Sequence, residues 1–171
     1  NLSQAAGVFA LAAQTLTVTG TVTMTGGGLT FTTGAMNVTG NFTISAAGAF
    51  IQFGSGAHTL SGTWTNSSTS ASWDATAGEV VFNSATGGTM AFAGTNLAED
   101  EFSSVTFDSS ATTAQTFTMA TRGLRYGGTL IVDDAGVEAV NNILTTSGSN
   151  LAITGGGLTL GAGGTLTLNA S

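Results

Sequence analysis

The amino-acid sequence predicts an all-β protein that folds as a parallel β-solenoid, or β-helix. Three observations predict it: short alternating apolar pairs recur along the chain, a repeat of about 21 residues relates them, and glycine or a small polar residue separates one pair from the next. Alternation with period two indicates strands that bury one face. The 171 residues would then form about eight rungs of this length, with three short strands per rung.

The repeat is clearest in the N-terminal half. Residues 14–25 (QTLTVTGTVTMT) align with residues 34–45 after a shift of 20, and residues 60–64 (LSGTW) follow in the same columns after a further 22. In the other direction, residues 7–11 align with residues 27–31. One rung therefore contains three apolar pairs, which are Leu16 with Val18, Val22 with Met24, and Leu29 with Phe31.

The C-terminal half shows a similar period. The aligned residues are Leu130 and Val132 with Leu151 and Ile153, Val137 with Leu158, and Leu144 with Leu166. The phrase MTGGGLTF (24–31) also returns as ITGGGLTL (153–160), at a shift of 129. This recurrence predicts the same corner and strand six rungs apart, with Ile153 in the strand position of Met24.

Residues 1–171 are expected to form a single solenoid domain with an irregular middle at about 87–115. There the spacing lengthens, and residues 97–102 (LAEDEF) look like an acidic excursion before a strand at 103–107. At the corners, glycine can supply the positive φ that a tight turn requires.

Composition excludes several classes of protein. Only 6% of the residues are charged, the net charge is -7, and Arg122 and Arg125 are the only basic residues besides one histidine. Nucleic-acid binding and docking on anionic membranes both require clustered Lys or Arg. No apolar run reaches the length of a membrane span, so no membrane insertion is expected. The chain has no cysteine and hence no disulfide or Cys-ligated metal.

The carboxylates do not predict an enzyme. Asp74, Glu79, Asp108 and Glu138 are scattered, and neighbouring acids on a strand point to opposite faces, whereas acid/base chemistry needs two carboxyls at one cleft. Asp133 and Asp134 with Glu138 offer oxygen ligands for Ca²⁺, but no EF-hand or GGxGxD loop is present. We therefore expect no catalytic residue, no cofactor and no metal.

Several single residues have two interpretations. His58 aligns with Leu16 and Met36 and is expected as a half-buried core residue, while Trp64 aligns with Val22 and Phe42 in the core. Trp73 and Tyr126 are candidate exposed aromatics for stacking on a sugar, although packing is the favoured interpretation. Arg122 and Arg125 either pair with the acidic excursion across a subunit joint or are solvated.

The two ends of the chain match. Leu2 and Gln4 fall in the second strand position and Leu166 and Leu168 in the first, so another copy would continue the coil. Neither end shows a cap, and an uncapped rung leaves backbone groups unpaired. This predicts a head-to-tail homopolymer.

The expected interface residues are Leu2, Gln4, Phe9, Leu11, Leu158, Leu160, Leu166 and Leu168. Further surface contacts are expected at Trp73, Glu99, Asp100, Glu101, Arg122 and Arg125. The alternative is that the chain is one segment of a giant tandem protein.

Thr-x-Thr units such as Thr17/Thr19, Thr21/Thr23 and Thr30/Thr32 are typical of flat solenoid faces that bind ice. An ice-binding face should concentrate threonine in one strand position, whereas these units occur in all three. The sequence therefore argues against this function.

The phrases LTVTG, NFTIS, HTLSGTWTNSS, GEVVFNSATGG and SVTFDSS resemble the repeats of secreted bacterial adhesin-like β-solenoid surface proteins. The resemblance implies an extracellular or cell-surface location and a structural or adhesive role. We therefore expect a structural subunit of an extracellular filament or surface fibre. The alternative function is a segment of a larger adhesin-like protein that binds carbohydrate or neighbouring surfaces.

Overall fold

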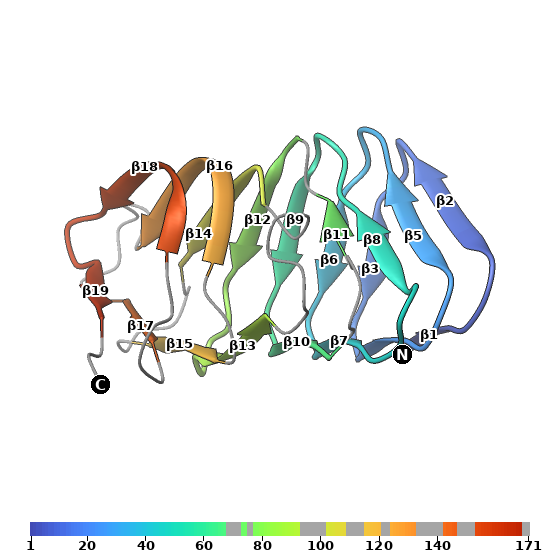
Figure 1. The fold of residues 1–171 in the computed structure, drawn as a ribbon, viewed down its shortest axis with the longest axis horizontal. Coiled ribbons are helices and arrows are strands. Elements are labelled where there is room, and N and C mark those ends of the chain that lie inside the picture. Colours follow the sequence, from blue (N-terminus) through green and yellow to red (C-terminus); the bar gives the residue numbers. More distant parts are fainter. Residues whose placement is uncertain are drawn as a thin grey trace.

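The computed structural model describes residues 1–67, 73–74, 77–92, 102–108, 115–120, 124–132, 142–146 and 153–168. This part of the chain coils into a parallel β-solenoid bounded by three sheets, and it confirms the predicted fold class (Figure 1). Strands of successive rungs pair in parallel in every sheet. The apolar alternation decides this architecture, because each short strand buries one face toward the axis of the coil.

Sheet A lies along the lower face in Figure 1 and has eight strands. They are β1 (Leu2–Gln4), β4 (Val22–Met24), β7 (Phe42–Ile44), β10 (Trp64–Asn66), β13 (Gly88–Phe92), β15 (Thr116–Ala120), β17 (Ile143–Thr146) and β19 (Thr165–Thr167). Sheet B has four described strands, β2 (Val8–Ala12), β5 (Gly28–Phe31), β8 (Phe50–Gln52) and β11 (Trp73–Asp74).

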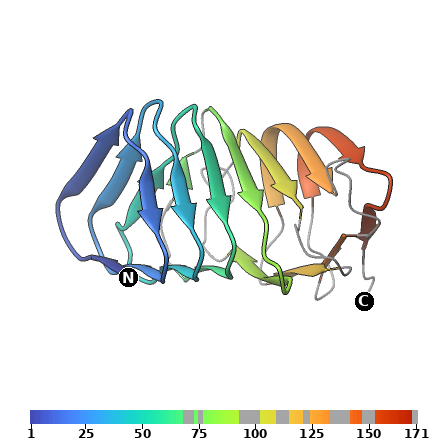
Figure 2. The same cartoon turned by 180° about the vertical axis from the view of Figure 1, so that it is seen from behind.

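Sheet C has seven strands and faces the viewer in Figure 2. They are β3 (Leu16–Val18), β6 (Met36–Val38), β9 (Ala57–Leu60), β12 (Glu79–Phe82), β14 (Ser104–Phe107), β16 (Leu124–Val132) and β18 (Ile153–Leu160). The described stack is thus shorter than about eight complete rungs, since only sheet A has eight strands.

The number of residues per rung is nearly constant only in the N-terminal part. In sequence number, the shift between register partners is 20 from Leu2 to Val22 and 22 from Phe42 to Trp64. The shift then rises to 26 from Trp64 to Met90 and to 29 from Met90 to Met119. The coil therefore lengthens earlier than the predicted irregular middle at about 87–115.

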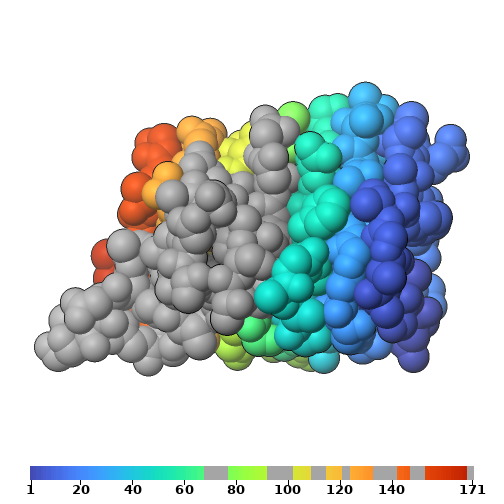
Figure 3. All heavy atoms as spheres, turned by 45° about the vertical axis from the view of Figure 1, so that its right-hand side comes forward, coloured from blue at the N-terminus to red at the C-terminus, as the bar shows by residue number. Residues whose placement is uncertain are grey.

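The corner between sheets A and B depends on glycine. Gly7, Gly27 and Gly48 precede β2, β5 and β8 and have φ values of 72°, 65° and 80°. This left-handed conformation is costly for residues with a side chain. Glycine with positive φ therefore recurs at this corner in three successive rungs, at one register position for Gly7 and Gly27 and one residue earlier for Gly48. The rungs follow one another as bands across the surface in Figure 3.

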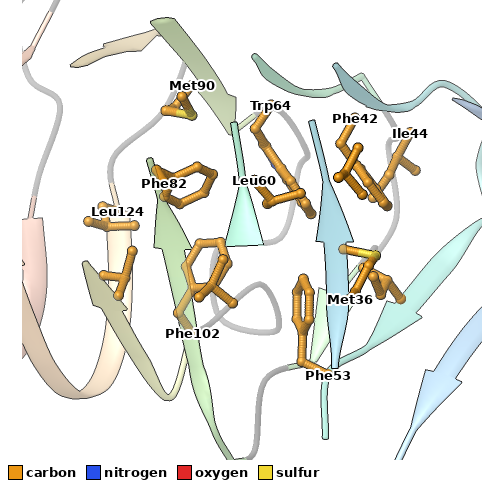
Figure 4. Close-up of a cluster of buried hydrophobic side chains, with 14 of the residues drawn as sticks. Met36, Phe42, Ile44, Phe53, Leu60, Trp64, Phe82, Met90, Phe102 and Leu124 are labelled. Atoms are coloured by element: carbon orange, nitrogen blue, oxygen red, sulfur yellow. The ribbon is translucent and has the colours of Figure 1, made fainter. Parts of the chain in front are cut away.

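The core is a column of apolar side chains that converge from the three sheets (Figure 4). Phe42 and Trp64 are register partners on adjacent rungs, and their rings stack at 4.7 Å with an interplanar angle of 6°. Phe82 and Phe107 repeat this arrangement at 5.0 Å. Like residues therefore stack along the axis, which ties each rung to the next by side-chain packing as well as by backbone hydrogen bonds.

Candidate assembly interface at the two end rungs

The N-terminal rung consists of β1, β2 and β3, each of which lies at the edge of its sheet. Val8 and Phe9 on β2 are 58% and 44% exposed, although Phe9 is the register partner of Leu29, whose side chain is fully buried. Phe9 therefore belongs to a core column but stands on the open face of its rung. Leu2, Gln4 and Leu11, which are also predicted interface residues, are partly buried on the same rung.

The C-terminal rung of the described chain consists of β18 and β19, which are the edge strands of sheets C and A. Leu158 and Leu160 on β18 are 50% and 47% exposed, and Leu168, directly after β19, is 63% exposed. Leu158 and Leu160 pair with Leu130 and Val132, which are both fully buried. The exposed leucines of β18 thus continue columns of side chains that are buried in the preceding rung.

The large exposed apolar side chains of the described chain all lie on these two rungs. The predicted interface residues therefore fall at the two edges of the stack, with Leu166 partly buried beside Leu168. Val8 is a further exposed residue that the sequence prediction missed. It alternates with Phe9 along β2 and pairs with Gly28, so it lies on the opposite face of the strand from Phe9.

Two predicted alignments at the C-terminal end are wrong. Ile153 is not in the strand position of Met24: it pairs with Leu124 in sheet C, and Leu158 follows Leu130 instead of Val137. The two TGGGLT phrases also differ, because residues 24–31 pass from β4 to β5 across a corner, whereas residues 153–160 form the single strand β18. The register shift from Leu130 to Leu158 is 28 residues. The sequence alignment assumed a period of about 21 residues and therefore matched the wrong partners here.

The first and last described strands lie in the same sheet. β1 and β19 are the two edges of sheet A. The second strand position predicted for Leu2 and Gln4 is confirmed, because they pair with Val22 and Met24. The first position predicted for Leu166 is wrong, because Leu166 pairs with Leu144 in sheet A. A second copy would therefore place its β1 directly over β19 and its β3 over β18.

The register determines which residues would meet in such a stack. One apolar column of sheet C passes from Val18 to Val38, Leu60, Phe82, Phe107, Val132 and Leu160. Continuing this column would bring Leu160 against Val18 of the next copy. The neighbouring column likewise starts at Leu16 and ends at Leu158.

His58 is fully buried, which corrects the expected half-buried position. The backbone N–H of Met36 donates to Nδ1 at 3.1 Å, and Nε2 lies 3.2 Å from the carbonyl oxygen of Gly54. A neutral ring with its proton on Nε2 satisfies both contacts. Burial lowers the pKa of His58, and the Gly54 carbonyl opposes this by favouring the charged ring. His58 is therefore a structural residue of the core.

Among the candidate sugar-binding aromatics, Tyr126 is only 6% exposed, so the packing interpretation is the correct one. Trp64 is fully buried, as predicted. The backbone of Trp73 and Asp74 forms β11. Glu99, Asp100, Glu101, Arg122, Asp133, Asp134 and Glu138 lie outside the described residues, while Arg125 is partly buried on β16.

A second surface feature is an open depression of about 590 Å³ on the outer face of sheet C. It is lined by Ser55, Ala57, Glu79, Ser104, Thr129 and Ile131, among others. The Thr106 hydroxyl donates to the Glu79 carboxylate. Among the described residues of this lining, Glu79 is the one carboxylate, so they do not supply the pair that acid/base hydrolysis requires.

Within the described ranges, no group of three or more His, Cys, Asp or Glu side chains is placed to hold a metal ion. The same part of the chain contains no helix long and apolar enough to cross a membrane. No protein-family model, curated protein or solved structure matches this chain.

Proposed function

We propose that this protein is a structural subunit of an extracellular filament or surface fibre, in which copies stack head to tail through their end rungs. The observation that carries the proposal is the location of the large exposed apolar side chains, which lie on the first and last rungs of the described chain. Phe9, Leu158 and Leu160 belong to core columns, so a second copy on the open edge would bury them as the interior buries their register partners.

The backbone supports the same proposal. The N-terminal rung has an edge strand in each of the three sheets, and the C-terminal rung of the described chain has edge strands in sheets A and C. These strands present N–H and C=O groups to an incoming strand, and parallel pairing would continue the ladder at about 4.8 Å. No charged side chain lies on β1, β2, β3, β18 or β19 to oppose this pairing. The low overall charge of 6% favours close stacking for the same reason.

The second candidate is a segment of a larger adhesin-like protein that binds carbohydrate or neighbouring surfaces. The depression on sheet C favours it, since its hydroxyls and the Glu79 carboxylate are groups that can hydrogen-bond a sugar. In such a protein the end rungs would pair with further rungs of the same chain. No catalytic activity is proposed for either candidate.

The proposal is tested by a substitution that places a charge on one edge strand. Leu160→Asp would place a carboxylate in the apolar column at the joint, where desolvation is unfavourable, and it should abolish filament growth followed by light scattering and electron microscopy. Thr159→Asp is the matched control, because Thr159 lies on the same strand and edge but in the outward-facing register of Ile131. This control should still polymerise.

Two results would contradict the proposal. The first is a wild-type chain that stays monomeric at high concentration, which would favour the adhesin segment. The second is equal polymerisation of the two variants, which would place the contact elsewhere. Circular dichroism of both variants checks that the solenoid is intact.

A further inference from the structure

The outer face of sheet A carries two ladders of hydroxyl groups. Ser3, Thr23, Thr43 and Thr65 are in direct register on β1, β4, β7 and β10. Thr89, Thr118, Thr145 and Thr167 are in direct register on β13, β15, β17 and β19. All eight side chains are partly or fully exposed, and they alternate with core residues such as Val22 and Met90.

The two ladders are neighbouring columns of one lattice. Trp64 pairs with Met90, so Thr63 stands next to Thr89, and the chain at β10 carries a hydroxyl in both columns at Thr63 and Thr65. Thr21 and Thr23 do the same at β4. Adjacent strands repeat at about 4.8 Å, and alternate residues along a strand at about 6.6 Å, so the hydroxyls occupy sites of a regular two-dimensional array. Asn41 interrupts one column, and Ala91 and Ala120 end the other.

Several of these hydroxyls are available to water. Within the described part of the chain, the hydroxyls of Thr43, Thr65 and Thr118 bond to no other residue. On sheet C, by contrast, Thr59 donates to Asn37 at 2.7 Å and Ser61 to Asn83 at 2.7 Å. The outer face of sheet C is also interrupted by Val81, Ile131 and Glu79.

The array is rigid and uncharged. No charged residue occurs on the described strands of sheet A, and fully buried Phe42, Trp64 and Met90 pack directly beneath it. The β-branched side chain of threonine has few χ1 rotamers, so its methyl and hydroxyl groups keep their positions. Such a face orders water without the competing hydration shell that a charged side chain holds.

We propose that the outer face of sheet A is an ice-binding surface. The lattice planes of ice present oxygen atoms in regular rows, and ordered hydroxyls and methyls at regular spacing can join such rows without further loss of side-chain freedom. The sequence pattern argued against this function because Thr-x-Thr units occur in all three strand positions. The register answers that objection, since the two ladders of four hydroxyls each lie on sheet A.

The experiment is partition of the purified protein into a slowly growing ice hemisphere, with inhibition of ice recrystallisation as a second readout. The wild type should be enriched in ice relative to a soluble protein without such a face. Thr43→Lys and Thr118→Lys should each reduce the enrichment several-fold, because a long cation in the array prevents close contact. Thr30→Lys is the matched control on the outer face of sheet B, with the same change of charge, and it should keep wild-type partition.

Exclusion of the wild type from ice would overturn the proposal, as would equal partition of the Thr43→Lys and Thr30→Lys variants. Binding of the wild type to crystalline cellulose or chitin without enrichment in ice would also overturn it, and would assign the array to a polysaccharide surface. The Leu160→Asp subunit serves as a further sample, because it keeps the array whether or not the filament forms. Its enrichment in ice separates this inference from the proposed assembly.

Discussion

At the scale of single residues, the core accommodates one polar ring at the cost of a fixed protonation state. His58 stands in a column with Met36 and Val80, and its ring meets Phe31 and Phe53 edge-on at 5.3 and 4.8 Å. The contact from Met36 N–H to Nδ1 requires an unprotonated nitrogen. The buried ring is therefore compatible with the fold only while it is neutral.

This protonation state predicts a stability that depends on pH. The pKa of His58 is lowered in the folded protein, so the unfolded chain binds the proton more tightly, with an ordinary pKa of about 6.5. The free energy of unfolding should be highest above about pH 6.5 and should decrease as the pH falls below that value, until the folded pKa is reached. Chemical denaturation between about pH 7.5 and about pH 5.5 measures this change before the carboxylates titrate.

The control for this prediction is His58→Leu. It should be less stable than the wild type at neutral pH by about 1–3 kcal/mol, because the Met36 N–H loses its buried partner. Its stability should not change over the same pH window. A wild-type stability that is constant in this window would contradict a neutral buried His58.

At the scale of strands, glycine and aromatic residues are paired across neighbouring rungs. Gly28 is the register partner of Phe50, and a Cβ at Gly28 would lie 2.2 Å from the Phe50 ring. Gly155 is the register partner of Tyr126, and its Cβ would lie 2.3 Å from that ring. Both TGGGLT phrases therefore give room to an aromatic ring of the adjacent rung, although they occupy different parts of the coil.

This pairing predicts unequal effects of the same substitution along β18. Gly155→Val should lower the free energy of unfolding by about 1–3 kcal/mol, because the Tyr126 ring is buried and has little space to move. Gly157→Val is the matched control, since its Cβ would meet Thr129 at an ordinary 3.6 Å. Its effect should stay within about 0.5 kcal/mol. Chemical denaturation of both variants measures the difference.

A double-mutant cycle identifies the cause. Tyr126→Ala combined with Gly155→Val should be more stable than the sum of the single effects predicts, because the clash is removed with the ring. Additive effects would mean that Gly155→Val acts through the backbone instead.

The sequence predicted the part of the fold in which rung length is constant. Leu2, Val22 and Phe42 are separated by equal shifts of 20, so a search at a fixed period finds them. The threonine ladder from Thr89 to Thr118 and Thr145 has shifts of 29 and 27, and no fixed period aligns it. The register shift between Tyr126 and Thr129 in the pairing of β16 with β18 was likewise not predicted.

At the scale of the whole molecule, the register makes a prediction about the geometry of the assembled fibre. The chain has no cysteine, so Val18→Cys together with Leu160→Cys provides a single pair of thiols. The two positions are at opposite ends of one column, and in adjacent copies their Cα atoms would lie about 4.8 Å apart. This distance is within the range of a disulfide. Mild oxidation should therefore yield covalent ladders on a non-reducing gel.

The control pair is Val18→Cys with Leu168→Cys, since these positions end columns in different sheets. It should give no ladder under the same conditions. A ladder from the control pair alone would mean that copies stack with a rotation about the axis, and the proposed register would be wrong.

The parallel arrangement of every sheet gives the molecule a direction. One end shows Val8 and Phe9 and the other shows Leu160 and Leu168, so the two tips of the proposed fibre would be chemically different. Subunits would then add at a different rate at each tip, and the fibre would be polar. A Leu160→Asp subunit keeps an intact N-terminal tip and would dock once and then block the next addition, so that a small fraction of it acts as a one-sided chain terminator.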